Sequence, residues 1–597
     1  MLDIFREIET EIDYAFPTET KFVKSDKFAV DENIVFYRNS ADIFRAALRL
    51  KAGLICGDAG YFEPDKFDGL SFFVDCSRNA VPTVATVEKI IRIAALLGYN
   101  SVMLYMEDVF ETDGEPVFGY MRGRYSKAEL KAMDAYAAET GIELIPAIQT
   151  LAHFEKLKRW YKEYDALFDC EDILTVGNER VYKLIENIFG TLSECFTSRR
   201  VHIGMDEAHM MGRGRYLDEN GFKPVFDIFI PHLEKVTAIA ERYGFSCIMW
   251  GDMFFSETRR AGGKTLSIPK SVASRLPKNV SVSHWCYEAG GERYAERYKA
   301  FEVFGDSVYM ALSTHKCLDF LPMNRYAEHE YDVAFSTLEN CPFMRNLINC
   351  AWSDNGGECS IFSALPAMTY FACKAYGLSF SDAKKLFFAL TDTEYDDFCK
   401  LEYANTMCGT VTDDYASPSK LFLYNDVLCG QFDCEITPEY RETFVKAKAA
   451  AESLSDSKYG VLFRNTAAYM DVLIPKLDMG LRVRSAYAEG DKAELKRIAD
   501  EIPSVVSKTD KFLETLRERW FAENKPQGFE IQELRLGGVK ERFSGVRKRL
   551  IDYACGKVFS IPELDEPILP DIYQGRNEKT GRLQWSSFAL TVSVNAL

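Results

Sequence analysis

The sequence predicts an α/β protein: a (β/α)8 TIM barrel with a small N-terminal α/β segment and an α-helical C-terminal domain. The first observation behind this prediction is that short apolar runs alternate with helix-like stretches between about residue 68 and residue 375. Strands that alternate with helices eight times are the signature of this barrel. In chain order the runs are GLSFFVDCSR, NSVMLYMED, IELIPAIQT, RRVHIGMDE, FSCIMWGDM, NVSVSHWCY, DSVYMALSTHK and NLINCAWSDN.

The second observation is the periodicity of the segments between these runs. Stretches such as TVEKIIRIAALLG and KAELKAMDAYAAETG repeat apolar residues at helical spacing and end in Gly. Glycine is the residue that most often ends a helix just before a strand. An open, doubly wound sheet is the alternative, but such a sheet rarely needs eight strands over about 300 residues.

The third observation is that the runs change character at their ends. Most begin with apolar residues and finish with charged or aromatic ones. In a TIM barrel the strand ends converge on one face, where active sites lie, and core packing disfavours charges. These end residues are therefore candidates for a functional site: Arg78, Asp108, His153, Asp206, Glu207, Trp250, Asp252, Trp285, Tyr287, Trp352 and Asp354.

The pattern divides the chain into three parts. Residues 1–67 form a small α/β segment with the strand NIVFYR, the helix SADIFRAALRLKAG and a short strand at LICG. Residues 68–375 form the barrel. Residues 376–597 are mainly α-helical, and their last stretch, LQWSSFALTVSVNAL, is more typical of strand or irregular chain.

The composition argues against several classes of partner. A net charge of −18 repels phosphate backbones, so no nucleic-acid partner is expected. The start of the chain does not resemble a signal peptide, and the apolar stretch IAALLGYNSVMLYM is too short and too polar to span a bilayer. The 16 Cys include no C-x-x-C pair, which is typical of reduced thiols in a cytoplasmic protein.

The stretch RRVHIGMDEAHMMGRGRYLD contains the letters DEAH, which helicases use for ATP hydrolysis. That interpretation requires a phosphate-binding loop, G-x-x-x-x-G-K-[ST]. The nearest match, AGGKT, has Thr258 in place of the first Gly and follows the DEAH letters. A metal site is also disfavoured, because His202 and His209 lack the spacing of metal-binding helices.

A sugar-cleaving enzyme accounts for more of the strand-end residues. Cleavage of a glycosidic bond needs a carboxylic acid with a raised pKa near the leaving oxygen. Asp206 and Glu207 are consecutive at a strand end, so their side chains point in different directions and serve different roles. Trp side chains offer flat apolar walls to a sugar, and Arg or Asp at other strand ends can hold its hydroxyl groups.

These residues resemble a known family. HIGMDEAH is similar to the H-x-G-x-D-E signature of family 20 glycoside hydrolases, the β-N-acetylhexosaminidases. Further segments resemble, in order, the short-form exo-β-N-acetylglucosaminidases of streptococci and other Firmicutes, which lack an N-terminal accessory domain and carry a helical C-terminal domain. They are FVDCSRNAVP, LYMEDVFE, FGYMRGRYS, PAIQTLAHF, DEAHMMGRGRYL, MWGDMFF, WSDNGGE, DMGLRVRSAY and ENKPQGFEIQELRLGG.

The resemblance implies a retaining, substrate-assisted mechanism. In that mechanism the substrate's own 2-acetamido oxygen attacks the anomeric carbon and gives an oxazolinium intermediate. Glu207 is then the general acid and base, and Asp206 accepts a hydrogen bond from the acetamide N–H. Tyr287 donates to the acetamide oxygen, with Tyr309 as the second candidate.

The resemblance also implies how the sugar is held. The residues expected to enclose the acetamido methyl group and the ring are Trp250, Trp285 and Trp352. Those expected to hold the hydroxyl groups are Arg78, Asp354 and, with a weaker match, Glu358. His153 is expected to bridge Asp108 and Glu207 and so to support the acid.

One loop departs from the family pattern. Relatives carry A-G-G-x-W-K-W-x-G-F after the seventh strand, and this chain has ALSTHKCLDF over Ala311–Phe320. The two Trp positions become His315 and Cys317, whereas Lys316 remains. Three explanations stay open: a preference for GalNAc over GlcNAc, a sulfated or phosphorylated sugar that binds His315 and Lys316, or weak activity.

We therefore expect an exo-β-N-acetylhexosaminidase that removes terminal β-linked GlcNAc or GalNAc from oligosaccharides. It is expected to need no cofactor and no metal and to bind neither nucleic acid nor membrane. The sequence does not give the oligomeric state, and a homodimer stays open. Two other hypotheses are kept: a catalytically weak sugar-binding relative on the same barrel, and a P-loop-like ATPase.

Overall fold

Eight parallel strands close into a barrel in a computed structural model that describes residues 3–55, 60–63, 65–255, 267–287, 292–306, 308–406 and 417–568. Each strand pairs with the next one along the chain, and the last pairs with the first. Each of the eight apolar runs contains one strand, so the predicted TIM barrel is confirmed. The strands are β5 (Gly69–Asp75), β6 (Ser101–Tyr105), β7 (Glu143–Ala147), β10 (Arg200–His202), β11 (Ser246–Trp250), β12 (Val280–Trp285), β13 (Val308–Ser313) and β14 (Met344–Ala351).

Inward-pointing side chains fill the barrel. Side chains alternate between the two faces of a strand, and the inward set consists mainly of aromatic and Ile side chains. The interior is therefore a packed core, and a binding site can form only at one of its ends. The buried cluster is Phe73, Met103, Tyr105, Ile145, Ala147, Ile248, Trp250, Tyr309, Ala311, Ile348 and Cys350.

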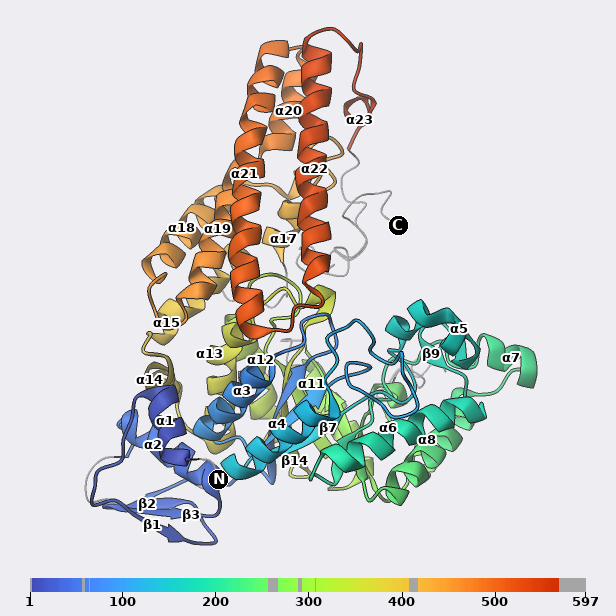
Figure 1. Ribbon diagram of the computed structural model, residues 1–597, viewed down its shortest axis with the longest axis vertical. Helices are drawn as coiled ribbons and strands as arrows, with labels where there is room; N and C mark the ends of the chain where they lie inside the picture. Colours follow the sequence, from blue (N-terminus) through green and yellow to red (C-terminus); the bar gives the residue numbers. More distant parts are fainter. Residues whose placement is uncertain are drawn as a thin grey trace. The chain divides into compact units, whose positions relative to one another are not determined.

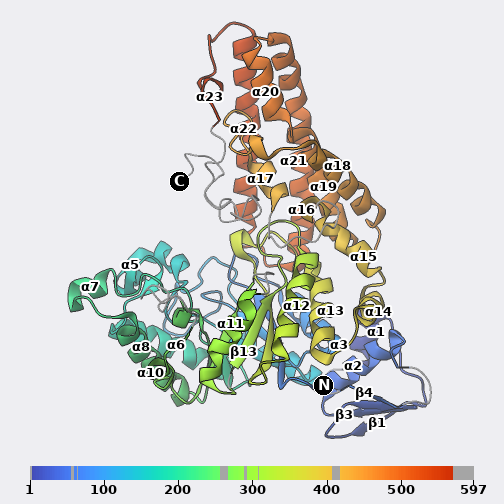
Figure 2. The ribbon, with the colours of Figure 1, turned by 180° about the vertical axis from the view of Figure 1, so that it is seen from behind.

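Helices connect the strands, and the predicted glycine caps are present. Gly98 ends α3 (Val84–Leu97) at a φ of 96°, and Gly141 ends α4 (Lys127–Thr140) at a φ of 81°. Glycine adopts these left-handed conformations without steric cost. The other long helices between strands are α6 (Glu179–Cys195), α8 (Val225–Arg242), α11 (Glu292–Phe301) and α12 (Asn324–Leu338), which can be traced in Figures 1 and 2.

The N-terminal segment forms a four-stranded sheet beside two helices, α1 (Ile4–Ile12) and α2 (Ser40–Lys51). The predicted strand NIVFYR is β3 (Ile34–Tyr37), and the predicted helix is α2. Three strands were not predicted: β1 (Lys21–Lys24), β2 (Ala29–Asp31) and β4 (Tyr61–Phe62). Of the expected strand LICG, residues 54 and 55 are not in a strand, and residues 56 and 57 lie outside the described residues.

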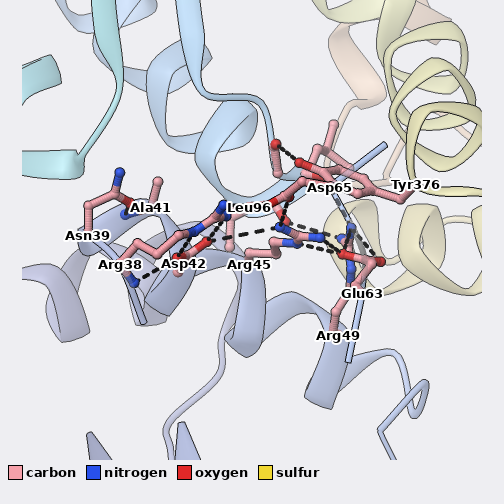
Figure 3. A network of polar contacts seen from close by, with 12 residues as sticks. Arg38, Asn39, Ala41, Asp42, Arg45, Arg49, Glu63, Asp65, Leu96 and Tyr376 are labelled. Atoms are coloured by element: carbon pink, nitrogen blue, oxygen red, sulfur yellow. Dashed lines mark hydrogen bonds and ion pairs between the residues drawn. The ribbon is translucent and has the colours of Figure 1, made fainter. Parts of the chain in front are cut away.

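A buried charge network fixes this segment to the barrel (Figure 3). Arg45 and Arg49 on α2 are both fully buried and share the carboxylate of Glu63, which follows β4. Arg49 also donates to the carbonyl oxygen of Leu97 at the end of α3, at 3.3 Å. The Arg45 guanidinium lies 3.9 Å from the ring centroid of Tyr376. Removal of one partner from such a buried pair costs about 3–5 kcal/mol.

The chain forms two compact units that interleave in sequence. The barrel unit comprises Met1–Thr314, Glu328–Trp352 and Met368–Leu390. The helical unit comprises His315–Ala327, Ser353–Ala367 and Thr391–Leu597. The segments that follow β13 and β14 therefore belong to the helical unit.

Long helices make up the helical unit, as expected. The two longest, α21 (Lys492–Glu523) and α22 (Phe529–Ala554), lie side by side (Figure 1). α21 also packs on α19 (Gly460–Lys476), and α19 packs on α18 (Pro438–Ser453). Within the described ranges, no helix has both the length and the apolar character needed to cross a membrane. The expected terminal stretch LQWSSFALTVSVNAL lies outside the described residues.

Candidate active site

The turn after β10 carries Asp206 and Glu207 in an uncommon backbone conformation. Gly204, Met205 and Glu207 have φ values of 69°, 76° and 52°. Non-glycine residues in this region store strain, which concentrates at functional sites. A Cβ atom on Gly204 would lie 2.0 Å from Oε1 of Gln149. The glycine of the H-x-G-x-D-E signature is therefore required for this turn to pack against Gln149.

Asp206 is buried and accepts two hydrogen bonds. Its Oδ1 accepts from Nε2 of Gln149 at 2.8 Å, and its Oδ2 lies 3.1 Å from Nε2 of His153. Burial alone would raise the pKa of Asp206, but His153 and the Gln149 amide hold it at about 2. Burial also opposes a charge on His153, yet the Asp206 carboxylate raises its pKa to about 10. The two side chains form an imidazolium–carboxylate pair at neutral pH.

Glu207 has a more open environment than Asp206. Its side chain is 49% exposed, and its Oε2 lies 3.7 Å from Nε2 of His153. Its backbone N–H donates to Oδ2 of Asp252 at 3.0 Å. Burial, reinforced by the charge of Asp206, raises the pKa of Asp252 to about 8. Of these three carboxyl groups, Glu207 is the one best placed to exchange a proton with a bound ligand.

A chain of hydrogen bonds leads from Asp206 to Arg78. Nε2 of Gln149, which contacts Asp206, also donates to the Tyr105 hydroxyl at 2.8 Å. That hydroxyl donates to Glu107 at 3.0 Å. Glu107 pairs with Arg78 at 3.4 Å, and Arg78 donates to Asp75 at 3.0 Å. The guanidinium is thus held at the same end of the barrel as the Asp206–Glu207 pair.

Aromatic side chains surround this end of the barrel. Trp285 and Trp352 are partly exposed and pack on the core below them. The Tyr287 ring stacks on Trp285 at 5.3 Å between centroids, and its hydroxyl accepts from Nε1 of Trp352 at 2.8 Å. Trp250 is completely buried, with its ring 5.9 Å from that of Trp352. Trp285, Tyr287 and Trp352 offer an apolar wall with polar edges, and Trp250 supports it from inside.

Comparison with known proteins places this site in a family. A model of the glycosyl hydrolase family 20 catalytic domain matches residues 71–345, and a model of the glycoside hydrolase 20C C-terminal domain matches residues 396–584. The chain belongs to glycosyl hydrolase family 20. The catalytic-domain match contains Asp206, Glu207 and the network around them.

Individual family 20 relatives are distant. Hexosaminidase D of Bos taurus is 24% identical over 225 residues, which are 36% of this chain and 61% of that protein. A β-hexosaminidase of Akkermansia muciniphila is 28% identical over 191 residues, 26% of this chain and 37% of that protein. The chain therefore spans less than two thirds of these curated relatives. The solved family 20 exo-β-N-acetylglucosaminidase from Vibrio harveyi has a TM-score of 0.48 and 13% identity, covering 65% of this chain and 70% of that one.

The structure separates the two tyrosine candidates of this family 20 chain. Tyr287 follows β12 at the end that carries Asp206. Tyr309 is near the start of β13, and its hydroxyl accepts from Nη1 of Arg200 at 3.2 Å. Arg200 is the first residue of β10, so Tyr309 lies toward the opposite, amino end of the strands. This geometry favours Tyr287.

Asp108 does not occupy the position expected for it. Its carboxylate pairs with Arg122, and His153 instead contacts Asp206 and Glu207. The expected bridge from Asp108 through His153 is therefore not formed. Burial, opposed by the charges of Arg78 and His153, raises the pKa of the neighbouring residue Glu107. Glu107, rather than Asp108, faces the site.

Four of the residues expected at the site belong to the helical unit: His315, Lys316, Asp354 and Glu358. Glu358 is buried, and its carboxylate oxygens pair with Lys420 and Arg535. These contacts lie within the helical unit, and the contact of Glu358 with a sugar hydroxyl stays a prediction. Asp354 starts a short 3-10 turn, Asp354–Gly356, and is partly exposed.

Two residues of the altered loop, His315 and Lys316, are buried and belong to the helical unit. The His315 ring packs edge-on against Tyr326 at 4.6 Å between centroids. Nζ of Lys316 donates to Oγ of Ser353 at 2.7 Å. Both side chains are almost completely buried in this structure, so the structure does not show the exposed pair of cations expected at the rim.

His202, the last residue of β10, is completely buried. Burial lowers the pKa of His202 to about 3, and its Nδ1 accepts from the N–H of Gly204 at 3.2 Å, so it is neutral and structural. Among the described residues, no group of three His, Cys, Asp or Glu side chains is arranged to hold a metal ion.

Sequence reasoning did not assign site roles to Gln149 and Asp252. Both lie in segments that carry the family resemblance, PAIQTLAHF and MWGDMFF, and both lie just beyond a strand. Their position at strand ends was the available signal. Their contacts with Asp206 and with the Glu207 backbone appear only in three dimensions.

Proposed function

We propose that this chain is a retaining exo-β-N-acetylhexosaminidase that removes terminal β-linked N-acetylhexosamine by substrate-assisted catalysis. The observation that carries the proposal is the arrangement of Asp206, Glu207 and His153: a buried carboxylate and a half-exposed carboxyl group that share one imidazolium. Membership of family 20 supports it. A closer likeness to the short-form enzymes of Firmicutes is part of the same proposal.

Asp206 suits the role of stabilising the substrate's acetamide. A pKa of about 2 keeps it ionised throughout the physiological pH range. Its two oxygens accept from Gln149 and His153 and retain lone pairs for the acetamide N–H. As the acetamide oxygen attacks the anomeric carbon, positive charge develops on the acetamide nitrogen. A fixed carboxylate beside that charge lowers the barrier without reorganising.

Glu207 suits the role of proton donor to the leaving oxygen. When it gives up its proton, the carboxylate that results lies 3.7 Å from the His153 imidazolium, which stabilises it. In the second step the same carboxylate removes a proton from the water that opens the oxazolinium ring. The backbone hydrogen bond to Asp252 holds Glu207 in its strained conformation throughout.

Tyr287 and the tryptophans suit the role of positioning the acetamide. The Tyr287 hydroxyl accepts from Trp352, and in the proposed mechanism it donates to the acetamide oxygen and orients that oxygen for attack. Trp285 and Trp352 provide flat walls for the methyl group and the sugar ring. Holding the nucleophile in reacting geometry is itself a large part of such catalysis.

The experiment compares hydrolysis of nitrophenyl β-GlcNAc and β-GalNAc by the wild type and by Glu207→Gln and Asp206→Asn. Both variants should lose activity by about 10²–10⁴-fold. The Glu207→Gln loss should be larger on a disaccharide, because nitrophenolate leaves without needing a proton. Proton NMR of the first-formed sugar should show the β anomer.

The same panel also tests the alternatives. Binding of N-acetylglucosamine-thiazoline, a mimic of the cyclised intermediate, is expected in the wild type. Sugar binding without turnover would identify a catalytically weak sugar-binding relative. The GlcNAc-to-GalNAc ratio, extended to 6-sulfated and 6-phosphorylated sugars, reports the specificity that the altered loop sets.

A further inference from the structure

Two loops at the mouth of the barrel present aromatic rings to solvent. Tyr120, in the loop after β6, is 40% exposed, and the neighbouring Met121 is 64% exposed. Tyr161, just after the 3-10 helix Glu155–Trp160 that follows β7, is 67% exposed. The rings of Tyr120 and Trp160 lie 5.4 Å apart between centroids. Such a pair of rings is a surface on which a sugar can stack.

The first of these loops is packed directly on the ends of β5 and β6. A Cβ on Gly119 would lie 2.0 Å from the backbone oxygen of Asp108, so the loop touches the chain there. Arg122 pairs with Asp108 and donates to the carbonyl oxygen of Ser77. Ser77 precedes Arg78, whose guanidinium lies 5.7 Å from the ring centroid of Trp352. Tyr120 is therefore held close to the wall of the site.

The second loop starts at the residue that contacts both carboxylates. His153 is two residues before the helix Glu155–Trp160. A rise of about 2 Å per residue carries that helix about 10–12 Å from its start to Trp160. Arg159 and Trp160 are the last two residues of this helix.

The second loop is also basic in a chain whose net charge is −18. The segment 156–162, KLKRWYK, has four cations and no acid, although Glu155 and Glu163 flank it. Lys158, Arg159 and Lys162 are exposed. Among the described residues none of these three forms an ion pair with a carboxylate, whereas Lys156 pairs with Glu155 at 3.4 Å. Burial raises the pKa of Asp108, and the positive charges of Arg159 and Lys156 act against that increase.

We propose that Tyr120, Trp160 and Arg159 form a subsite for the sugar that follows the cleaved N-acetylhexosamine, and that this second sugar is acidic. The rings stack on its apolar face, and Arg159 binds a carboxylate such as that of a hexuronic acid. This inference rests on the proposed function, because that function defines the terminal N-acetylhexosamine as the cleaved sugar and the next sugar as the one at this subsite. It narrows the substrate from oligosaccharides in general to those with an anionic second sugar.

The experiment measures binding with two disaccharides that differ in one group. One has GlcNAc β-linked to glucuronic acid, and the other has GlcNAc β-linked to glucose in the same linkage. The methyl β-glycoside of GlcNAc, which has no second ring, is the reference. Calorimetry on full-length Glu207→Gln protein gives dissociation constants without turnover. The variants on that background are Arg159→Gln, Tyr120→Ala and the matched control Lys131→Gln, an exposed cation on α4.

The expected result is that the acidic disaccharide binds more tightly than the neutral one. Arg159→Gln should weaken the acidic disaccharide by about threefold to fivefold and leave the neutral one unchanged. Added salt should reduce the same preference. Tyr120→Ala should weaken both disaccharides and spare the methyl glycoside. Lys131→Gln should change none of the three.

Several outcomes would overturn the subsite. They are equal binding of the two disaccharides, no binding of either, or an equal effect of Arg159→Gln and Lys131→Gln. Hydrolysis of nitrophenyl β-GlcNAc by the wild type is measured in parallel. If it occurs while the disaccharides bind equally, only the subsite fails. If it does not occur but the acidic preference depends on Arg159, the proposed activity fails, and a binding site for an acidic sugar at Tyr120, Trp160 and Arg159 stands.

Discussion

His153 and Asp206 form a charged hydrogen-bonded pair, with Nε2 of His153 3.1 Å from Oδ2 of Asp206. The pair joins a residue after β7 to a residue after β10, and these two strands are neighbours in the barrel. It keeps Asp206 ionised and places a positive charge beside Glu207. Both functions proposed for the carboxylates depend on it.

The first prediction concerns the titration of His153. Its folded-state pKa of about 10 lies above the ordinary value of 6.5, so its contribution to stability is complete below pH 6.5. That contribution is lost as the pH rises from 6.5 through 10. Asp206 acts in the opposite direction, because its pKa is lowered to about 2 and its contribution is lost only as the pH falls through that value. The pair should therefore stabilise the fold most between about pH 4 and 6.5.

NMR titration of the His153 ring protons tests this directly. In Asp206→Asn the pKa of His153 should fall by several units, because burial then acts without the compensating carboxylate. His202, which is buried nearby and neutral, should not titrate above pH 5 in either protein and is the internal control. A His153 pKa near 6.5 in the wild type would contradict the pair.

The second prediction concerns Asp252. Its folded-state pKa of about 8 is above the ordinary value of 3.8, so the fold retains a proton that the unfolded chain releases. Stability from this group is present below pH 3.8 and is lost as the pH rises to about 8. Asparagine reproduces the shape of the protonated carboxyl group and cannot ionise. Asp252→Asn should therefore raise the free energy of unfolding above pH 8 by up to about 6 kcal/mol, which corresponds to the pKa shift, and leave it nearly unchanged at pH 4.

Activity distinguishes a positioning role of Asp252 from a purely structural one. Asp252→Asn retains an acceptor for the Glu207 N–H and should keep neutral-pH activity within about threefold. It should also move the alkaline limb of the pH profile of kcat to higher pH. Asp252→Ala loses the acceptor and should lower kcat about tenfold. Equal kcat values and pH profiles in the two variants would rule out the positioning role.

The third prediction separates the two tyrosines. Tyr287→Phe removes the hydroxyl that meets Trp352 and should lower kcat by about 10²-fold, as removal of one oxyanion donor does. Tyr309→Phe removes a hydrogen bond to Arg200 at the other end of the strands. It should cost about 1 kcal/mol of stability and leave kcat within about twofold. Steady-state kinetics and thermal unfolding of both variants provide the test, and a reversed pattern would reassign the acetamide contact to Tyr309.

The barrel was predictable because its signal repeats. Eight apolar runs with helices between them constrain one another, and glycine caps at Gly98 and Gly141 mark the boundaries. The strands β1, β2 and β4 are only two to four residues long, so no periodicity distinguishes them from loops. Tertiary pairing, not local pattern, makes them strands.

The site was predictable in its location and less so in its contacts. The alternation of side chains stops at Tyr105, the last residue of β6, so the pattern cannot show which of Glu107 and Asp108 faces the site. The sequence also does not show how deep in the barrel a strand-end side chain lies. Trp250 and Trp285 look equivalent as strand ends, yet one is completely buried and the other is partly exposed.

The fourth prediction concerns Gly204. Gly204→Ala places a Cβ 2.0 Å from Gln149 Oε1 and also strains a φ of 69°. Relief of the clash must move Gln149 or the turn, and both changes displace Asp206. We expect a loss of kcat of at least about tenfold, since small misplacements of reacting groups are costly. Gly244→Ala is the matched control, because Gly244 has a φ of 80° and only Arg199 within 4 Å. It should cost about 1 kcal/mol of stability and no activity.

The fifth prediction concerns the buried charge network of the N-terminal segment. Glu63→Gln leaves the buried cations Arg45 and Arg49 without their shared carboxylate. The free energy of unfolding should fall by about 3–5 kcal/mol, because an uncompensated charge stays buried. The KM for nitrophenyl β-GlcNAc should be unchanged, because the network contacts α2, α3 and Tyr376 and none of the candidate catalytic residues. Asp68→Asn breaks the exposed pair with Arg345 and should lower the free energy of unfolding much less than Glu63→Gln does, because exposed ion pairs contribute little. Equal destabilisation by the two variants, measured by urea unfolding, would show that the buried network does not fix the segment.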